Sequence, residues 1–143
     1  MLARTPRFLL AFSSLLSAAS GAIHAAAFGK ALSAISASNL PRLYAASCKA
    51  LWLEDSAVLF IVAAVSGLIA LRPSTASRPV VLFVALIPAS TAVLIYMFLG
   101  NFFAGHVLVA IAASALLAGL WYPGSAPGRV RAPRALRQTS RQL

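Results

Sequence analysis

Acidic residues are almost missing from this chain of 143 residues, which has only Glu54 and Asp55 against 12 lysines and arginines. Charged residues of both signs make up 10% of the sequence, whereas soluble domains carry roughly 25%. Apolar residues make up 61%, more than a soluble domain of this length could bury. The scarcity of charge therefore excludes an ordinary soluble domain and indicates a surface that faces lipid.

Cysteine and the known catalytic motifs are also scarce. The single cysteine, Cys48, can form no internal disulfide, and no cysteine pair suggests a zinc or redox site. The sequence contains no nucleophile elbow, phosphate-binding glycine loop or HExxH motif. The net charge of +10 would favour nucleic acid binding in a soluble protein. Here the basic residues lie between apolar runs and in the C-terminal segment, so we expect no nucleic acid partner.

Long apolar runs are the main positive feature of the sequence. A helix needs about 20 apolar residues to cross ~30 Å of hydrocarbon. The stretch 79–122 would be roughly 66 Å long as one helix, so we expect it to turn back at Gly100-Asn101. We predict an all-α fold, an integral membrane four-helix bundle with up-down topology. The predicted helices cover about residues 8–28, 50–71, 79–99 and 102–122.

The segments between and after these runs differ in character. Residues 29–49 form a longer polar connection, in which Pro41 is suited to the first turn of a helix and would let the second helix begin early. Residues 72–78 form a short loop. Residues 1–122 form the predicted membrane domain, and residues 123–143, rich in Pro, Gly and Arg, form a predicted disordered basic tail. We expect this tail to contact anionic lipid.

The distribution of basic residues predicts an orientation. With four spans, the N-terminus, the 72–78 loop and the tail share one side and hold nine lysines and arginines, against three on the other side, Lys30, Arg42 and Lys49. Basic residues are enriched on the cytoplasmic side of membrane proteins. We therefore predict a multi-pass protein of the cell membrane, the inner membrane in a bacterium, with both termini in the cytoplasm.

The first run has a second interpretation as a cleaved signal peptide. Arg4 and Arg7 precede it, and Ala25-Ala26-Ala27 offers a cleavage pattern. The apolar run is about 20 residues, longer than the usual 7–15 of a signal peptide. Ser13 and His24 also fall on one helical face together with Ser17 and Ser20, which suggests packing against other helices. We favour a retained helix.

Four ionisable residues fall near the outer ends of the predicted helices: His24, Glu54, Asp55 and His106. Ionisable groups inside a membrane are costly and mark candidate functional sites. In an up-down bundle these residues lie at similar depth, so we predict that they form a polar cluster. Neighbouring residues on a helix differ by about 100°, so only one of the two acids can point into the bundle, and we favour Glu54.

This cluster supports several functions, and the sequence leaves them open. The missing catalytic motifs favour a small interaction or accessory protein, in which the cluster is structural. Two imidazoles, His24 and His106, could instead ligate a metal ion or haem in a redox bundle. His24 with Glu54 could serve a lipid-modifying enzyme or a proton-coupled carrier.

Small residues on the predicted helices favour close packing. Ser17 and Gly21 on the first helix, and Ala110, Ser114 and Ala118 on the fourth, have the spacing that lets helix backbones approach within a membrane. The fourth-helix stripe begins at His106, which we therefore expect to meet protein. Such faces could also mediate assembly into a homo- or hetero-oligomer.

Three segments resemble family signatures: GAIH at 21–24, KALWLEDS at 49–56 and GNFFAGH at 100–106. In general plan, residues 8–122 resemble small four-span bacterial membrane proteins such as the DoxX-like families. This resemblance implies a four-helix membrane bundle and assigns no particular activity, because fold alone does not determine function.

Overall fold

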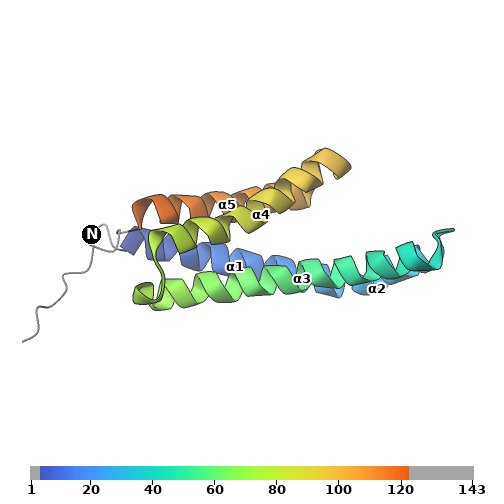
Figure 1. Ribbon diagram of the computed structural model, residues 1–143, viewed down its shortest axis with the longest axis horizontal. Helices are drawn as coiled ribbons and strands as arrows, with labels where there is room; N and C mark the ends of the chain where they lie inside the picture. Colours follow the sequence, from blue (N-terminus) through green and yellow to red (C-terminus); the bar gives the residue numbers. More distant parts are fainter. Residues whose placement is uncertain (1–3, 123–143) are drawn as a thin grey trace, which may run out of the picture.

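The structure, a computed structural model, describes residues 4–122, and this part of the chain is mostly helical and contains no strands (Figure 1). The all-α prediction is confirmed. The elements are α1 (Arg4–Ala26), α2 (Phe28–Ser36), α3 (Arg42–Leu71), the 3-10 turn η1 (Pro73–Thr75), α4 (Arg78–Leu99) and α5 (Phe103–Trp121). The tail predicted over 123–143 lies outside the described residues.

Across residues 4–122, four helical elements are long and apolar enough to cross a membrane. They are α1 continued by α2, then α3, α4 and α5. Large apolar side chains are exposed along all of them, for example Phe83, Met97 and Phe103, as expected where the surrounding solvent is lipid. This is the architecture of a small multi-pass membrane protein.

The predicted bounds are close for α4 and α5 and too short for the first two spans. The first span continues through α2, and α3 begins at Arg42, directly after Pro41, which confirms the early start that Pro41 indicated. The 29–49 connection is therefore mostly helical. At roughly 1.5 Å per residue, α3 with its 30 residues is about 45 Å long, whereas α5 with 19 residues is about 28 Å long. The α2–α3 hairpin consequently projects beyond the α4–α5 hairpin (Figure 1).

The two ends of the bundle differ in packing. At one end, which we call the closed end, α1 and α4 begin and α3 and α5 finish. A buried cluster holds this end together, formed by Leu10, Ile69, Ala70, Val81, Ala118 and Tyr122. Arg7 adds a clamp, because its guanidinium Nε donates to the carbonyl oxygen of Ala70 at 3.0 Å, near the end of α3. The Tyr122 hydroxyl donates to the carbonyl of Pro73; burial raises the pKa of this phenol, and the charge of Arg7 opposes that rise.

Serine hydroxyls and small residues join α1 to its neighbours. Ser14 Oγ donates to the carbonyl oxygen of Ala63 on α3 at 2.7 Å, and Ser13 Oγ donates to that of Ile111 on α5 at 3.3 Å. Ser13 and Ser17 are fully buried. The expectation that the serine face of the first helix packs against other helices is confirmed.

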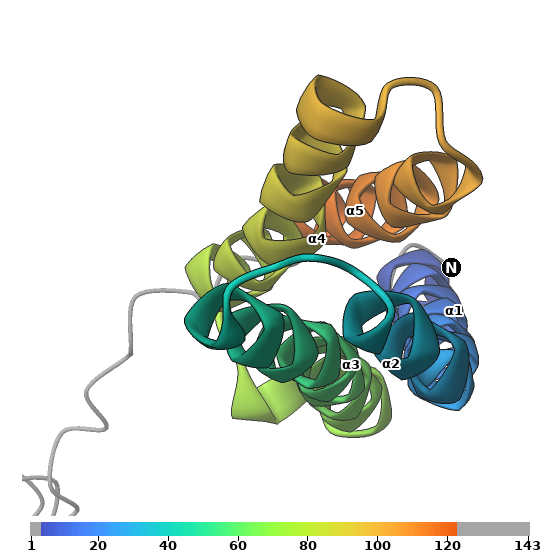
Figure 2. The same ribbon diagram turned by 90° about the vertical axis from the view of Figure 1, so that its right-hand side faces the viewer.

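At the other end, the open end, the two hairpins diverge. Residues 100–102 connect α4 to α5 here, with Gly100 at φ 69°, a conformation that favours glycine. The predicted turn at Gly100-Asn101 is confirmed. α1 packs extensively against both α3 and α5, whereas α3 and α4 touch little, and Figures 1 and 2 show α4 leaning away from α3. The four-helix ring is therefore incomplete on its α3–α4 side.

Candidate functional site

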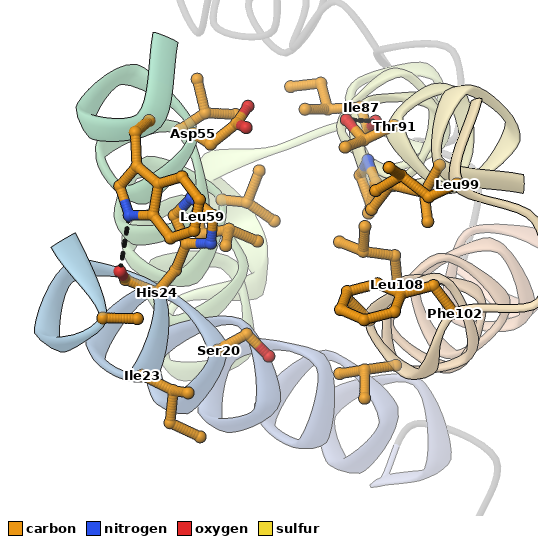
Figure 3. A pocket seen from close by; sticks show the side chains of 18 residues that line it. Ser20, Ile23, His24, Asp55, Leu59, Ile87, Thr91, Leu99, Phe102 and Leu108 are labelled. Atoms are coloured by element: carbon orange, nitrogen blue, oxygen red, sulfur yellow. Dashed lines mark hydrogen bonds between the residues drawn. The ribbon is translucent and has the colours of Figure 1, made fainter. Parts of the chain in front are cut away.

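A cavity of about 560 Å³ lies between the two hairpins in the open half of the bundle (Figure 3). α1, α3, α4 and α5 all contribute to its wall, which is mostly apolar. The polar or aromatic members are Ser20, His24, Trp52, Asp55, Thr91 and Phe102. The cavity exists because α4 diverges from α3, which leaves the facing side chains of the two hairpins without partners.

One wall of the cavity is organised by His24 and Trp52. The two rings are stacked, with centroids 4.3 Å apart and planes 13° from parallel. The indole Nε1 donates to the carbonyl oxygen of His24 at 2.9 Å (Figure 3). His24 Nε2 is shielded from solvent and has no hydrogen-bond partner among the described residues. The stacking and the hydrogen bond between Trp52 and His24 hold the end of α1 against α3 and give the cavity an aromatic wall.

Asp55, rather than Glu54, lies in the cavity wall. Asp55 follows Trp52 by three residues on α3, and residues with this spacing share a helical face. Both acids are exposed, but Glu54 does not line the cavity. The expectation that Glu54 is the inward acid is therefore not met by the cavity lining. The sequence alone does not determine how α3 is rotated about its own axis. That rotation is set by Ser56, Val62 and Ser66, which are buried, and it turns Asp55 toward the cavity.

The opposite wall comes from α4. Pro88 is buried and lines the cavity beside Ile87 and Thr91. The Thr91 hydroxyl donates to the carbonyl oxygen of Ile87 at 3.1 Å. The hydrogen of the Thr91 hydroxyl is therefore already used in a hydrogen bond within α4. Figure 3 shows Ile87 and Thr91 facing His24 across the cavity.

His106 does not join His24 at the cavity. Its side chain is exposed, makes an edge-on contact with Tyr96 at 5.6 Å between centroids, and places Nδ1 3.2 Å from the carbonyl oxygen of Phe102. The α5 stripe divides accordingly, because Ser114 and Ala118 are buried while His106 and Ala110 are exposed. Sequence spacing could not reveal this, because α5 meets α1 closely only toward the closed end.

The predicted cluster of four ionisable residues thus splits in the structure. His24 and Asp55 line one cavity, with Asp55 exposed at its rim, while the exposed side chains of Glu54 and His106 do not line it. Within residues 4–122, no three His, Cys, Asp or Glu side chains are grouped so that they could hold a metal ion. A metal or haem centre on His24 and His106 stays a prediction that this placement does not favour.

Sequence reasoning missed two elements of this site. Trp52 and Pro88 both line the cavity, and neither is among the candidate residues predicted from the sequence. The spacing of Trp52 and Asp55 was the available signal, because it places an aromatic ring and a carboxylate on one face of α3.

Comparisons with protein families, with curated proteins and with solved structures found no match. The likeness to DoxX-like proteins therefore rests on the four-span plan alone, and the function has to be argued from the cavity.

Proposed function

We propose that this protein is a non-catalytic accessory protein of the cell membrane that binds a lipid-like amphiphile in the cavity between its two hairpins. The observation that carries this proposal is the cavity itself, with apolar walls and a few polar groups at one side. Ligand sites in proteins usually have this composition. The cavity also lies where α3 and α4 diverge, so an acyl or alkyl chain could enter from the bilayer.

The depth of the polar groups suits an amphiphile. Asp55 precedes Leu71, the last residue of α3, by 16 positions, or about 24 Å along the helix at roughly 1.5 Å per residue. With Leu71 taken as the inner boundary of a hydrocarbon layer of ~30 Å, Asp55 would lie within that layer, about one turn from its outer boundary. A ligand bound here would keep its polar head near the boundary and its chain among the apolar side chains.

Binding is better supported than catalysis or transport. A catalytic reading would need an acid–base pair joined in the cavity. His24 and Asp55 both line it, but His24 Nε2 has no hydrogen-bond partner among the described residues, and Glu54, the predicted partner of His24, does not line it. A carrier would need access from both sides, whereas the closed end is filled by the cluster around Leu10, Ile69 and Val81. Interaction with a partner protein remains compatible with an accessory role.

A tryptophan-quenching experiment tests this function. The chain has two tryptophans, and Trp121 is exposed at the closed end, so the Trp121→Phe variant reports on Trp52 alone. In lipid nanodiscs, a neutral alkyl glycol with a bromine on the alkyl carbon next to its head should quench Trp52 with a saturable component. Ala104 lines the cavity, and Ala104→Phe in the same background should remove that component by filling the space.

The matched control is Ala113→Phe, which makes the same change at an exposed position of α5. It should leave the saturable quenching intact. Quenching that rises linearly with probe in every variant would mean that the probe only dissolves in the bilayer, and it would refute the proposed function.

A further inference from the structure

The charged residue that lines the cavity is acidic. Its lining includes the carboxylate of Asp55 and no lysine or arginine, in a chain that has 12 basic residues and only two acids. Figure 3 draws no hydrogen bond to the Asp55 carboxylate from another lining residue. The negative charge of Asp55 therefore faces the cavity without a basic side chain in the same wall.

The aromatic stack stands beside this carboxylate. Trp52 lies three residues before Asp55 on α3, so both project from one helical face into the same wall. Indole is the aromatic ring that attracts cations best, and aromatic walls recognise quaternary ammonium groups in other proteins. An ammonium group in the cavity would thus meet a carboxylate and an indole together.

The energetics at this depth favour the same ligand. A ligand drawn from the bilayer gains little from apolar walls, because lipid chains are as apolar as the wall. Selectivity must then come from the polar groups. A carboxylate inside the hydrocarbon boundary is costly when it has no partner, so a ligand that supplies a positive charge is favoured and an anionic ligand is repelled.

We propose that the cavity selects cationic amphiphiles, that is, ligands with an ammonium head and an alkyl or acyl chain, and that Asp55 and Trp52 recognise the head. This proposal rests on the proposed function, because it names the class of amphiphile that the same cavity takes.

The test compares three bromine-labelled probes of equal chain length in the Trp121→Phe background: an alkyl trimethylammonium, an alkyl sulfate and the neutral alkyl glycol. Saturable quenching of Trp52 in nanodiscs of zwitterionic lipid gives a midpoint for each probe. The ammonium probe should have a midpoint about tenfold lower than the neutral probe, the factor that about 1.4 kcal/mol produces. The sulfate probe should bind most weakly.

Asp55→Asn is the decisive variant, and Glu54→Gln is its matched control. Both changes remove one negative charge from neighbouring positions, but only Asp55 lines the cavity. Asp55→Asn should raise the ammonium midpoint to that of the neutral probe, while Glu54→Gln should leave it unchanged. Nanodiscs without protein correct for the different partitioning of the probes.

The outcomes separate the two proposals. Equal midpoints for the three probes, or an ammonium preference that survives Asp55→Asn, would overturn the cationic selectivity while leaving amphiphile binding in place. Loss of saturable quenching for all three probes would overturn the proposed function itself. A parallel loss in the Glu54→Gln variant would assign the preference to general surface charge and would also reject the role of Asp55.

Discussion

At the scale of single residues, close contact between α1 and α3 depends on Gly21. A Cβ on Gly21 would lie 3.2 Å from the Leu59 Cβ and 3.3 Å from the carbonyl oxygen of Ser56, neither of which can move without moving α3. We expect Gly21→Val to separate the two helices and to destabilise the protein by about 1–3 kcal/mol, the usual cost of overpacking. Thermal unfolding in a mild detergent measures this loss.

The control for this prediction is Gly29→Val. Gly29 lies in α2, and a Cβ there would meet nothing within 4 Å. Valine also has a slightly better helix propensity than glycine, so the melting temperature should stay level or rise slightly. Equal destabilisation by the two variants would show that the tight α1–α3 contact at Gly21 is not the cause.

Individual residues also mark the limit of what the sequence predicts about the site. His24 is correctly predicted to face protein because Ser13, Ser17 and Ser20 continue its face along α1. No comparable polar stripe on α3 shows which of Glu54 and Asp55 faces the bundle. The answer depends on which serines of α3 pack against α1. His106 has a small-residue stripe below it, but the stripe is buried only near the closed end.

At the scale of elements, α4 shapes the cavity through Pro88. Proline lacks a backbone N–H, so the carbonyl of Val84 loses its usual helical partner. The Ser90 and Thr91 hydroxyls donate to the carbonyl oxygen of Ile87, at 2.9 and 3.1 Å, and so do not replace the bond lost at Val84. We expect Pro88→Ala to restore the Val84 hydrogen bond, straighten α4 and change the cavity wall.

This change should weaken binding of the cavity probe about fivefold, which corresponds to about 1 kcal/mol. It should also slow hydrogen exchange around residues 84–88. Pro79→Ala is the control, because Pro79 stands in the first turn of α4, where proline removes no helical hydrogen bond. An unchanged midpoint together with unchanged exchange would contradict a role for Pro88 in shaping the cavity.

The elements themselves were largely predictable, with one systematic error. The ends of α4 and α5 follow from the Arg78-Pro79 step and from Gly100, which are local signals. The first two spans were predicted too short because the expected length came from the thickness of a bilayer. The ends of a helix are set by its backbone hydrogen bonds and not by the lipid boundary. Accordingly, α2 follows α1 closely, and α3 begins at Arg42.

At the scale of the whole molecule, two hairpins meet tightly at one end and separate at the other. Sequence periodicity gives the number of helices, but it contains no information on the angle between the hairpins. That angle results from the packing of α1 against α5, and it leaves α3 and α4 apart. The cavity is therefore a property of the assembled bundle that no single run of residues predicts.

The orientation of the molecule in the membrane decides which side the cavity serves. Among the described residues, Arg4, Arg7, Arg72 and Arg78 lie at or next to the closed end, whereas the basic residues toward the open end are Lys30, Arg42 and Lys49. Since basic residues are retained on the cytoplasmic side, we predict that the open end and its cavity face outward.

Cysteine labelling can test this prediction, because Cys48 is the single cysteine and is exposed near the start of α3. A membrane-impermeant maleimide should label Cys48 in intact cells. In the Cys48→Ser background, a cysteine added after Leu143 should be labelled only after the cells are opened. Cys48→Ser alone sets the background. Labelling of the added cysteine, but not of Cys48, in intact cells would invert the topology and place the cavity on the cytoplasmic side.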